Sequence, residues 1–115
     1  MDLNYKVTNL FPSSIHRLGI DNFDDYKDQL IKETYKERDE NPVGMRVSNC
    51  GGWQSNQTHI GDCKSETLKN IIMSSVSRLP MSGNLSCTID GWKNINEPGN
   101  FNMPHTHPKC HLSGV

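Results

Sequence analysis

Two stretches of the chain carry apolar side chains at the spacing of an amphipathic helix. The first predicts a helix that begins at the N-cap Asn22, has acidic residues in its first turn, and ends before Pro42 and Gly44. Its apolar face comprises Phe23, Tyr26, Leu30, Ile31, Thr34 and Tyr35.

The second predicted helix begins near Ser65, where Ser65 and Glu66 supply capping chemistry, and is closed by Pro80. Its apolar face comprises Leu68, Ile71, Ile72, Val76 and Leu79. A helix has to bury its apolar stripe against another element. We therefore expect both apolar faces to belong to the core and both helices to pack on a sheet.

After the second helix the pattern changes to alternation. From Asn84 the apolar positions are every second residue, which predicts a half-buried strand through Leu85, Cys87, Ile89 and Gly91, continued on the other phase by Trp92, Asn94 and Asn96. The segment Glu97-Pro98-Gly99-Asn100 predicts a hairpin turn. A strand from Phe101 to His107 follows, and another begins at His111 or Leu112.

Two helices followed by antiparallel strands indicate an α+β fold in a single domain, residues 1–115. Residues 1–82 are expected to provide a support of helices and loops. Residues 83–115 are expected to provide the first strands of the sheet.

Composition narrows the function classes. The 115 residues have a net charge of −1 and no basic patch, which argues against a dedicated nucleic-acid surface. The first ten residues lack the pattern of a signal peptide, and no apolar run reaches the length of a membrane-spanning helix. We expect a cytoplasmic protein that does not engage a membrane. Without a Cys-x-x-Cys pair, Cys50, Cys63 and Cys87 are expected to be free, partly buried thiols.

The candidate chemistry is concentrated near the last residues. His105 and His107 are two residues apart, so on an extended strand their imidazoles point to the same face and can chelate one metal ion. A His-x-His pair also arises by chance, so exposed histidines without a role stay open as the alternative. His16, His59 and His111 are expected to be exposed or structural.

Several motifs taken together resemble one family of 2-oxoglutarate-Fe(II) oxygenases that is frequent in marine bacteria and their phages. The order and spacing match from about Leu10 to Val115, so the resemblance covers nearly the whole chain, although each motif alone is weak. The motifs are Gly52-Trp53-Gln54-Ser55, Trp92-Lys93-Asn94-Ile95-Asn96, Gly99-Asn100-Phe101-Asn102, His105-Thr106-His107-Pro108 and Leu112-Ser113-Gly114-Val115.

The resemblance implies a fold and a set of cofactors. The family's fold is a double-stranded β-helix, or jelly-roll, and this chain would form its N-terminal part with two packed helices and with the later core strands missing. His105 would take the place of the first iron ligand and His107 that of the usual carboxylate, either as a ligand in an all-histidine site or as a group that supports the ligands, with 2-oxoglutarate as cosubstrate. The distal histidine and the arginine expected to bind 2-oxoglutarate are absent from the sequence, so the isolated chain is expected to be incomplete as an enzyme.

Some roles stay open in the resemblance. Trp53, Gln54, Trp92 and Asn94 would either line the active-site cavity or brace the sheet, with bracing favoured for the two tryptophans. The residues that bind 2-oxoglutarate, the catalytic residues and the substrate are not indicated.

Two other classes of function stay open. A non-catalytic module could hold zinc through His105, His107, Cys110 and His111, because zinc prefers tetrahedral nitrogen and sulfur ligands. A structural or interaction protein, of phage origin and acting in the host cytoplasm, could keep the fold without the chemistry. In the incomplete oxygenase fold, unpaired strand edges would favour a homo-oligomer.

Overall fold

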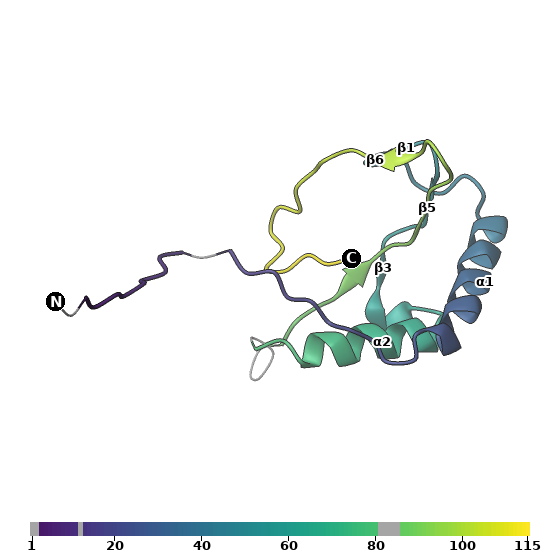
Figure 1. Ribbon diagram of the computed structural model, residues 1–115. Coiled ribbons are helices and arrows are strands. Elements are labelled where there is room, and N and C mark those ends of the chain that lie inside the picture. The colour runs from purple at the N-terminus through teal and green to yellow at the C-terminus, as the bar shows by residue number, and fades with distance from the viewer. Residues whose placement is uncertain (1–2, 12, 81–85) are drawn as a thin grey trace.

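The computed structural model describes residues 3–11, 13–80 and 86–115, and these form a mixed α+β fold (Figure 1). The two helices are α1, Asp24–Glu40, and α2, Glu66–Ser77. A short 3-10 helix, Ile60–Asp62, precedes α2. The strands are β1 (Asn49–Cys50), β2 (Trp53–Gln54), β3 (Thr58–His59), β4 (Asp90–Gly91), β5 (Asn94–Ile95) and β6 (Phe101–Asn102).

Helix α1 begins slightly later than the sequence predicts. Asn22 is not its N-cap: its φ of 56° lies in the left-handed region, and its carbonyl accepts the backbone N–H of Asp25 at 3.0 Å in a turn before the helix. Asparagine tolerates this conformation better than most residues. The acidic first turn, Asp24 and Asp25, is as expected, and the helix ends at Glu40, with Asn41 as its C-cap before Pro42.

Helix α2 follows its sequence signals closely. The Ser65 hydroxyl accepts the backbone N–H of Leu68 at 3.2 Å, so Ser65 is the N-cap, as predicted. The helix ends at Ser77, three residues before Pro80. Here the local chemistry of the cap decides where the helix begins.

The six strands form one irregular antiparallel ribbon. Asn49 pairs with Asn102, Trp53 with Ile95, and Thr58 with Gly91, so the segment 49–59 runs beside the segment 90–102 in reverse order. Between the paired stretches, the backbone N–H of Ser55 donates to the carbonyl of Lys93 at 2.9 Å, and further bonds extend the pairing beyond both ends of the ladder.

The predicted hairpin at Glu97–Asn100 is wrong. The turn itself forms, with the N–H of Asn100 donating to the carbonyl of Glu97 at 2.9 Å. The segments on either side do not pair with each other: β5 pairs with β2 and β6 with β1. The turn therefore interrupts one side of the ribbon between β5 and β6, opposite Gly51 and Gly52, which lie between β1 and β2. A turn motif fixes the local reversal of the chain but not the partner of the strands around it.

Three predicted strands are shorter than expected or not formed. The strand expected from Asn84 begins only at β4, and its first two positions lie outside the described residues. The strand expected over 101–107 ends at Asn102, and no strand forms at His111 or Leu112. After Met103, no backbone pairing between these segments and another strand occurs within the described residues.

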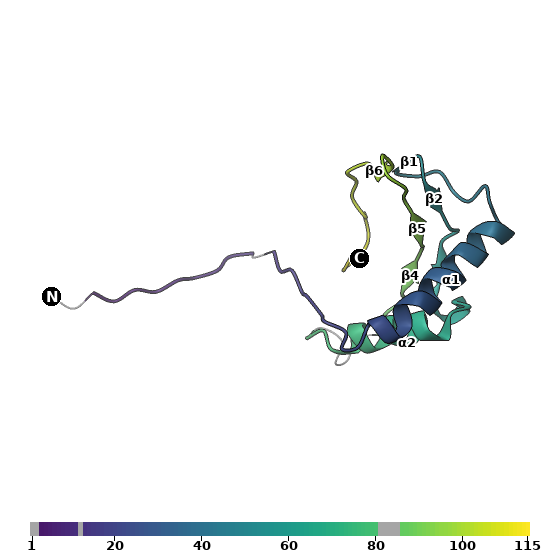
Figure 2. The ribbon, with the colours of Figure 1, turned by 45° about the vertical axis from the view of Figure 1, so that its right-hand side comes forward.

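The helices cover one side of the ribbon, and the segment after β6 curves back along the other (Figure 2). The indole N–H of Trp53 donates to the carbonyl of Asn41 at 2.8 Å, just after α1. The ammonium of Lys93 is paired with the carboxylate of Glu37 on α1. These contacts attach α1 to the ribbon.

The core is much smaller than the apolar stripes predict. Trp53, 6% exposed, is the buried hydrophobic side chain of the described residues. On α1, Phe23, Tyr26, Ile31 and Tyr35 are 41–45% exposed, so the expectation that this face is core is wrong. The face of α2 is half-buried. An amphipathic pattern predicts that a helix has an apolar face, but that face is buried only where another part of the protein packs on it.

Residues 3–11 extend away from the rest of the molecule (Figures 1 and 2). This arm explains the largest dimension of 69 Å and a radius of gyration of 18.3 Å, against about 13 Å for a compact chain of this length. Its apolar side chains, among them Tyr5 and Phe11, are almost fully exposed. Within the described parts of the chain, no helix has both the length and the apolar character to cross a membrane.

Candidate functional site

The segment that carries the candidate histidines is anchored where it leaves the ribbon. The backbone N–H of Met103 donates to the carbonyl of Ser48 at 2.7 Å. The side-chain amide of Asn102 donates to the hydroxyl of Ser48 at 3.2 Å and accepts from the amide of Asn96 at 2.8 Å. These bonds fix the peptide of Met103, which matters because its carbonyl faces the first histidine.

His105 is held in one tautomer by that carbonyl. Its Nδ1 lies 2.7 Å from the Met103 oxygen, and since a carbonyl can only accept, Nδ1 carries the proton. In the neutral ring Nε2 then has a free lone pair. Metal-binding histidines typically have this arrangement, in which the second ring nitrogen donates to an oxygen of the protein.

His107 meets that lone pair directly. The Nε2 atoms of His105 and His107 are 2.9 Å apart, and the ring centroids are 4.8 Å apart with a tilt of 37°. The prediction that the two imidazoles lie on the same side of an extended segment is confirmed. In the neutral pair, Nε2–H of His107 donates to Nε2 of His105.

Trp92, between β4 and β5, supports the second histidine. Its indole stacks on the imidazole of His107, with ring centroids 5.3 Å apart and an angle of only 5° between the ring planes. Both side chains are half-buried, while His105 is exposed. The stack therefore joins the C-terminal segment to the ribbon at the position of the histidine pair.

The pair fits two adjacent positions of a metal ion. Two nitrogens at about 2.1 Å from one ion and at right angles to each other are about 3.0 Å apart, close to the observed 2.9 Å. Further ligands are not assembled: no cluster of three or more His, Cys, Asp or Glu side chains suited to a metal ion occurs among the residues that the structure covers. The four residues of the alternative zinc site, His105, His107, Cys110 and His111, do not form such a cluster in this conformation, and zinc binding by them stays a prediction.

The four cysteines are free thiols at separate places in the fold. Cys50 and Cys63 are half-buried, Cys87 is exposed rather than partly buried, and Cys110 is exposed, with no disulfide among the four. His59 is used locally, because its Nδ1 accepts the backbone N–H of Gly61 at 3.1 Å.

A polar junction between α1, α2 and the ribbon is absent from the sequence-based expectations. Lys93 is paired with Glu37 and lies near Glu33, one helical turn away. Hydrogen bonds from the Ser65 hydroxyl and the Gln29 amide hold the pKa of Glu33 below its usual value, because together they outweigh the opposing effect of burial, and the charge of Lys93 adds a smaller lowering. The signal in the sequence is two acids four residues apart on the inner face of α1, opposite one lysine in a strand.

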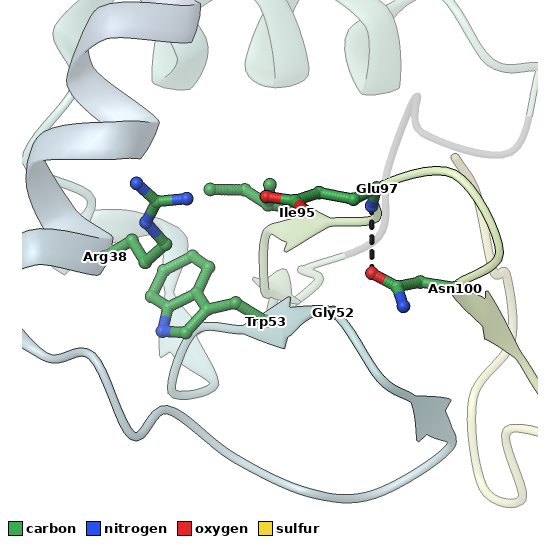
Figure 3. A pocket seen from close by; sticks show the side chains of 6 residues that line it. All are labelled: Arg38, Gly52, Trp53, Ile95, Glu97 and Asn100. Carbon is green, nitrogen blue, oxygen red and sulfur yellow. Dashed lines mark hydrogen bonds between the residues drawn. The ribbon is translucent and has the colours of Figure 1, made fainter.

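Two small hollows lie beside the ribbon, and neither includes the histidine pair. The first, of about 250 Å³, lies beside Trp53, with Arg38 on one wall and Glu97 and Asn100 on the other (Figure 3). The second, of about 240 Å³, lies between α1, α2 and β5 beside the polar junction.

The sequence left open whether the sheet residues brace the sheet or line a cavity, and their surroundings differ in the structure. Trp53 braces α1 against the ribbon through its bond to Asn41. Gln54 is 5% exposed, and no described group donates to its buried Oε1. Asn94, the register partner of Gln54, is exposed and borders the second hollow.

The site is thus a preformed two-histidine pair backed by an indole and a backbone carbonyl. Comparison of the chain with protein-family models, with curated proteins and with solved structures finds no match.

Proposed function

We propose that this chain carries the two-histidine part of the Fe(II) centre of a 2-oxoglutarate-dependent oxygenase. The observation that supports the proposal most is the His105–His107 pair, whose Nε2 atoms are 2.9 Å apart with the His105 tautomer set for binding. The motif resemblance supplies the class of reaction. The jelly-roll architecture belongs to the same proposal and is supported by a curved antiparallel ribbon with helices on one side (Figure 2).

Iron with bound 2-oxoglutarate supplies the oxidising chemistry of such a centre. His105 offers its Nε2 lone pair at once. His107 first has to move its proton from Nε2 to Nδ1 through solvent, so that its own lone pair faces the same point. The Met103 carbonyl keeps His105 in the right tautomer throughout.

Two neutral imidazoles leave both positive charges of the ion uncompensated, unlike the usual histidine and carboxylate. Such a centre favours anionic partners, which suits a dicarboxylate cosubstrate. The remaining metal ligand and the cation for the far carboxylate would come from groups outside the assembled pair.

The test is an anaerobic Fe(II) titration of the chain, with and without 2-oxoglutarate, that follows the weak visible charge-transfer band of the chelate. We expect a band that is lost in His105→Ala and in His107→Ala. His111→Ala is the matched control, because His111 is exposed in the same segment and should keep the band. A folded chain without a band, or a band that survives both substitutions, refutes the proposal.

A second candidate, an interaction protein, is favoured by the exposed apolar arm. Tyr5 is 91% exposed and Phe11 98% exposed, which is unusual for large apolar side chains. If the arm mediates association, light scattering should show oligomers that revert to monomers on deletion of residues 3–11. Monomers at all concentrations would leave this candidate without support from self-association.

A further inference from the structure

Trp92 contacts His107, the histidine of the pair whose Nδ1 has no hydrogen-bond partner among the described residues. His105 has its Nδ1 fixed by the Met103 carbonyl. No hydrogen bond from the described residues to Nδ1 of His107 is present, and its ring is held instead by the parallel stack on the indole of Trp92. The two histidines are therefore oriented by two different means.

We propose that Trp92 is a positioning residue for the metal site, which holds the His107 ring so that Nε2 points to the position shared with His105. This inference rests on the proposed function. It adds a determinant of metal affinity that lies outside the His-x-His motif and 15 residues away from His107 in the sequence.

The stack restricts the rotation of the imidazole. An imidazole attached by two rotatable bonds turns freely in an extended, unpaired segment, and that freedom is lost when a metal binds. The interplanar angle of 5° shows that the ring already lies flat on the indole. The entropy of orienting the ring is then largely lost before binding, which raises the affinity for the ion.

The electronic effect of the stack should also raise the affinity of His107 for a metal ion. A metal ion withdraws electron density from the imidazole, so the bound ring is more positive than the free ring. The face of an indole carries negative charge density and attracts a positive group stacked on it. Trp92 should therefore stabilise the metal-bound form of His107 more than the free form.

The experiment measures Co(II) binding by calorimetry, since Co(II) is a stable substitute for Fe(II) in air, in wild type, Trp92→Phe and Trp92→Leu. Leucine keeps apolar bulk without an aromatic face, and we expect its affinity to fall about tenfold, as is typical when a group that orients a metal ligand is lost. Phenylalanine keeps a stacking face and should remain within about threefold of wild type. The intrinsic fluorescence of Trp53, buried on the helix side of the ribbon, reports whether each variant is folded.

A second measurement covers the case in which Trp92→Leu fails to fold. Replacement of tryptophan by 5-fluorotryptophan keeps the shape but removes electron density from the face, and should weaken Co(II) binding. Quenching of indole emission by Co(II) in wild type should be lost in His107→Ala.

The outcomes separate the two proposals. If wild type binds no Co(II), the proposed function fails and the role of Trp92 fails with it. If wild type binds Co(II) through His105 and His107 and the folded Trp92→Leu variant binds it equally well, only the role of Trp92 is refuted. Where Trp92→Leu does not fold, equal binding by the fluorinated protein has the same meaning.

Discussion

The prediction that the structure constrains most closely concerns the stability effect of a side chain at Gly52, in the turn between β1 and β2. Its φ is +64°, and a Cβ atom there would lie 2.4 Å from Oδ1 of Asn96 and 2.7 Å from the carbonyl oxygen of Ile95. The Ile95 oxygen belongs to β5, so it cannot retreat without disturbing the pairing with β2. Gly52→Ala should therefore be strongly destabilising.

The magnitude has two parts that the chain allows to be separated. A left-handed conformation costs a residue with a Cβ about 1–2 kcal/mol, and forced overpacking costs about 1–3 kcal/mol more. Gly99 also has positive φ, at +91°, but no heavy atom lies within 4 Å of its Cβ position. Gly91 has neither feature. We expect Gly52→Ala to lose about 2–5 kcal/mol, Gly99→Ala about 1–2 kcal/mol, and Gly91→Ala less than about 0.5 kcal/mol.

Urea unfolding followed by the fluorescence of Trp53 and Trp92 gives the three free energies of unfolding. An equal loss for Gly52→Ala and Gly99→Ala would show that only the backbone angle matters. An equal midpoint for Gly52→Ala and Gly91→Ala would refute the close approach of the two strands at this turn.

Three further predictions use the same assay. Ser65→Ala should cost about 1 kcal/mol through the lost cap and raise the pKa of Glu33. That pKa lies below its usual value in the fold, so ionised Glu33 stabilises the protein above a pH of about 4.3, and this stabilisation is lost on acidification. The free energy of unfolding of the variant should therefore fall less between pH 7 and pH 3 than that of wild type. Lys93→Met should cost about 1–3 kcal/mol by leaving Glu37 without its cation, and adding Glu37→Gln should recover part of the loss; additive effects would contradict the pairing. Gln54→Leu should be neutral or stabilising, because Oε1 has no partner among the described residues, and a large loss of stability would show that this amide is bonded.

How far the sequence predicts the fold depends on the range of the interactions involved. The start of α2 follows from Ser65 and the residues beside it, and the structure agrees. The partner of β5 does not follow from the Glu97–Asn100 turn, because the strand it pairs with lies about forty residues earlier. Likewise, the stripe on α1 predicts a helix correctly but says nothing of what covers it, and it remains partly exposed.

The candidate site divides in the same way. By itself the sequence determined that His105 and His107 lie on one side of an extended segment, because side chains alternate along such a backbone. Only the tertiary structure decided that Ser48 fixes the Met103 peptide, whose carbonyl sets the tautomer of His105, and that Trp92 stacks on His107. The reason is physical: caps, turns and alternation depend on a few neighbouring residues, whereas the stack requires a distant segment to return to the ribbon. That return depends on long-range contacts, whose favourable energy must offset the entropy of closing the chain.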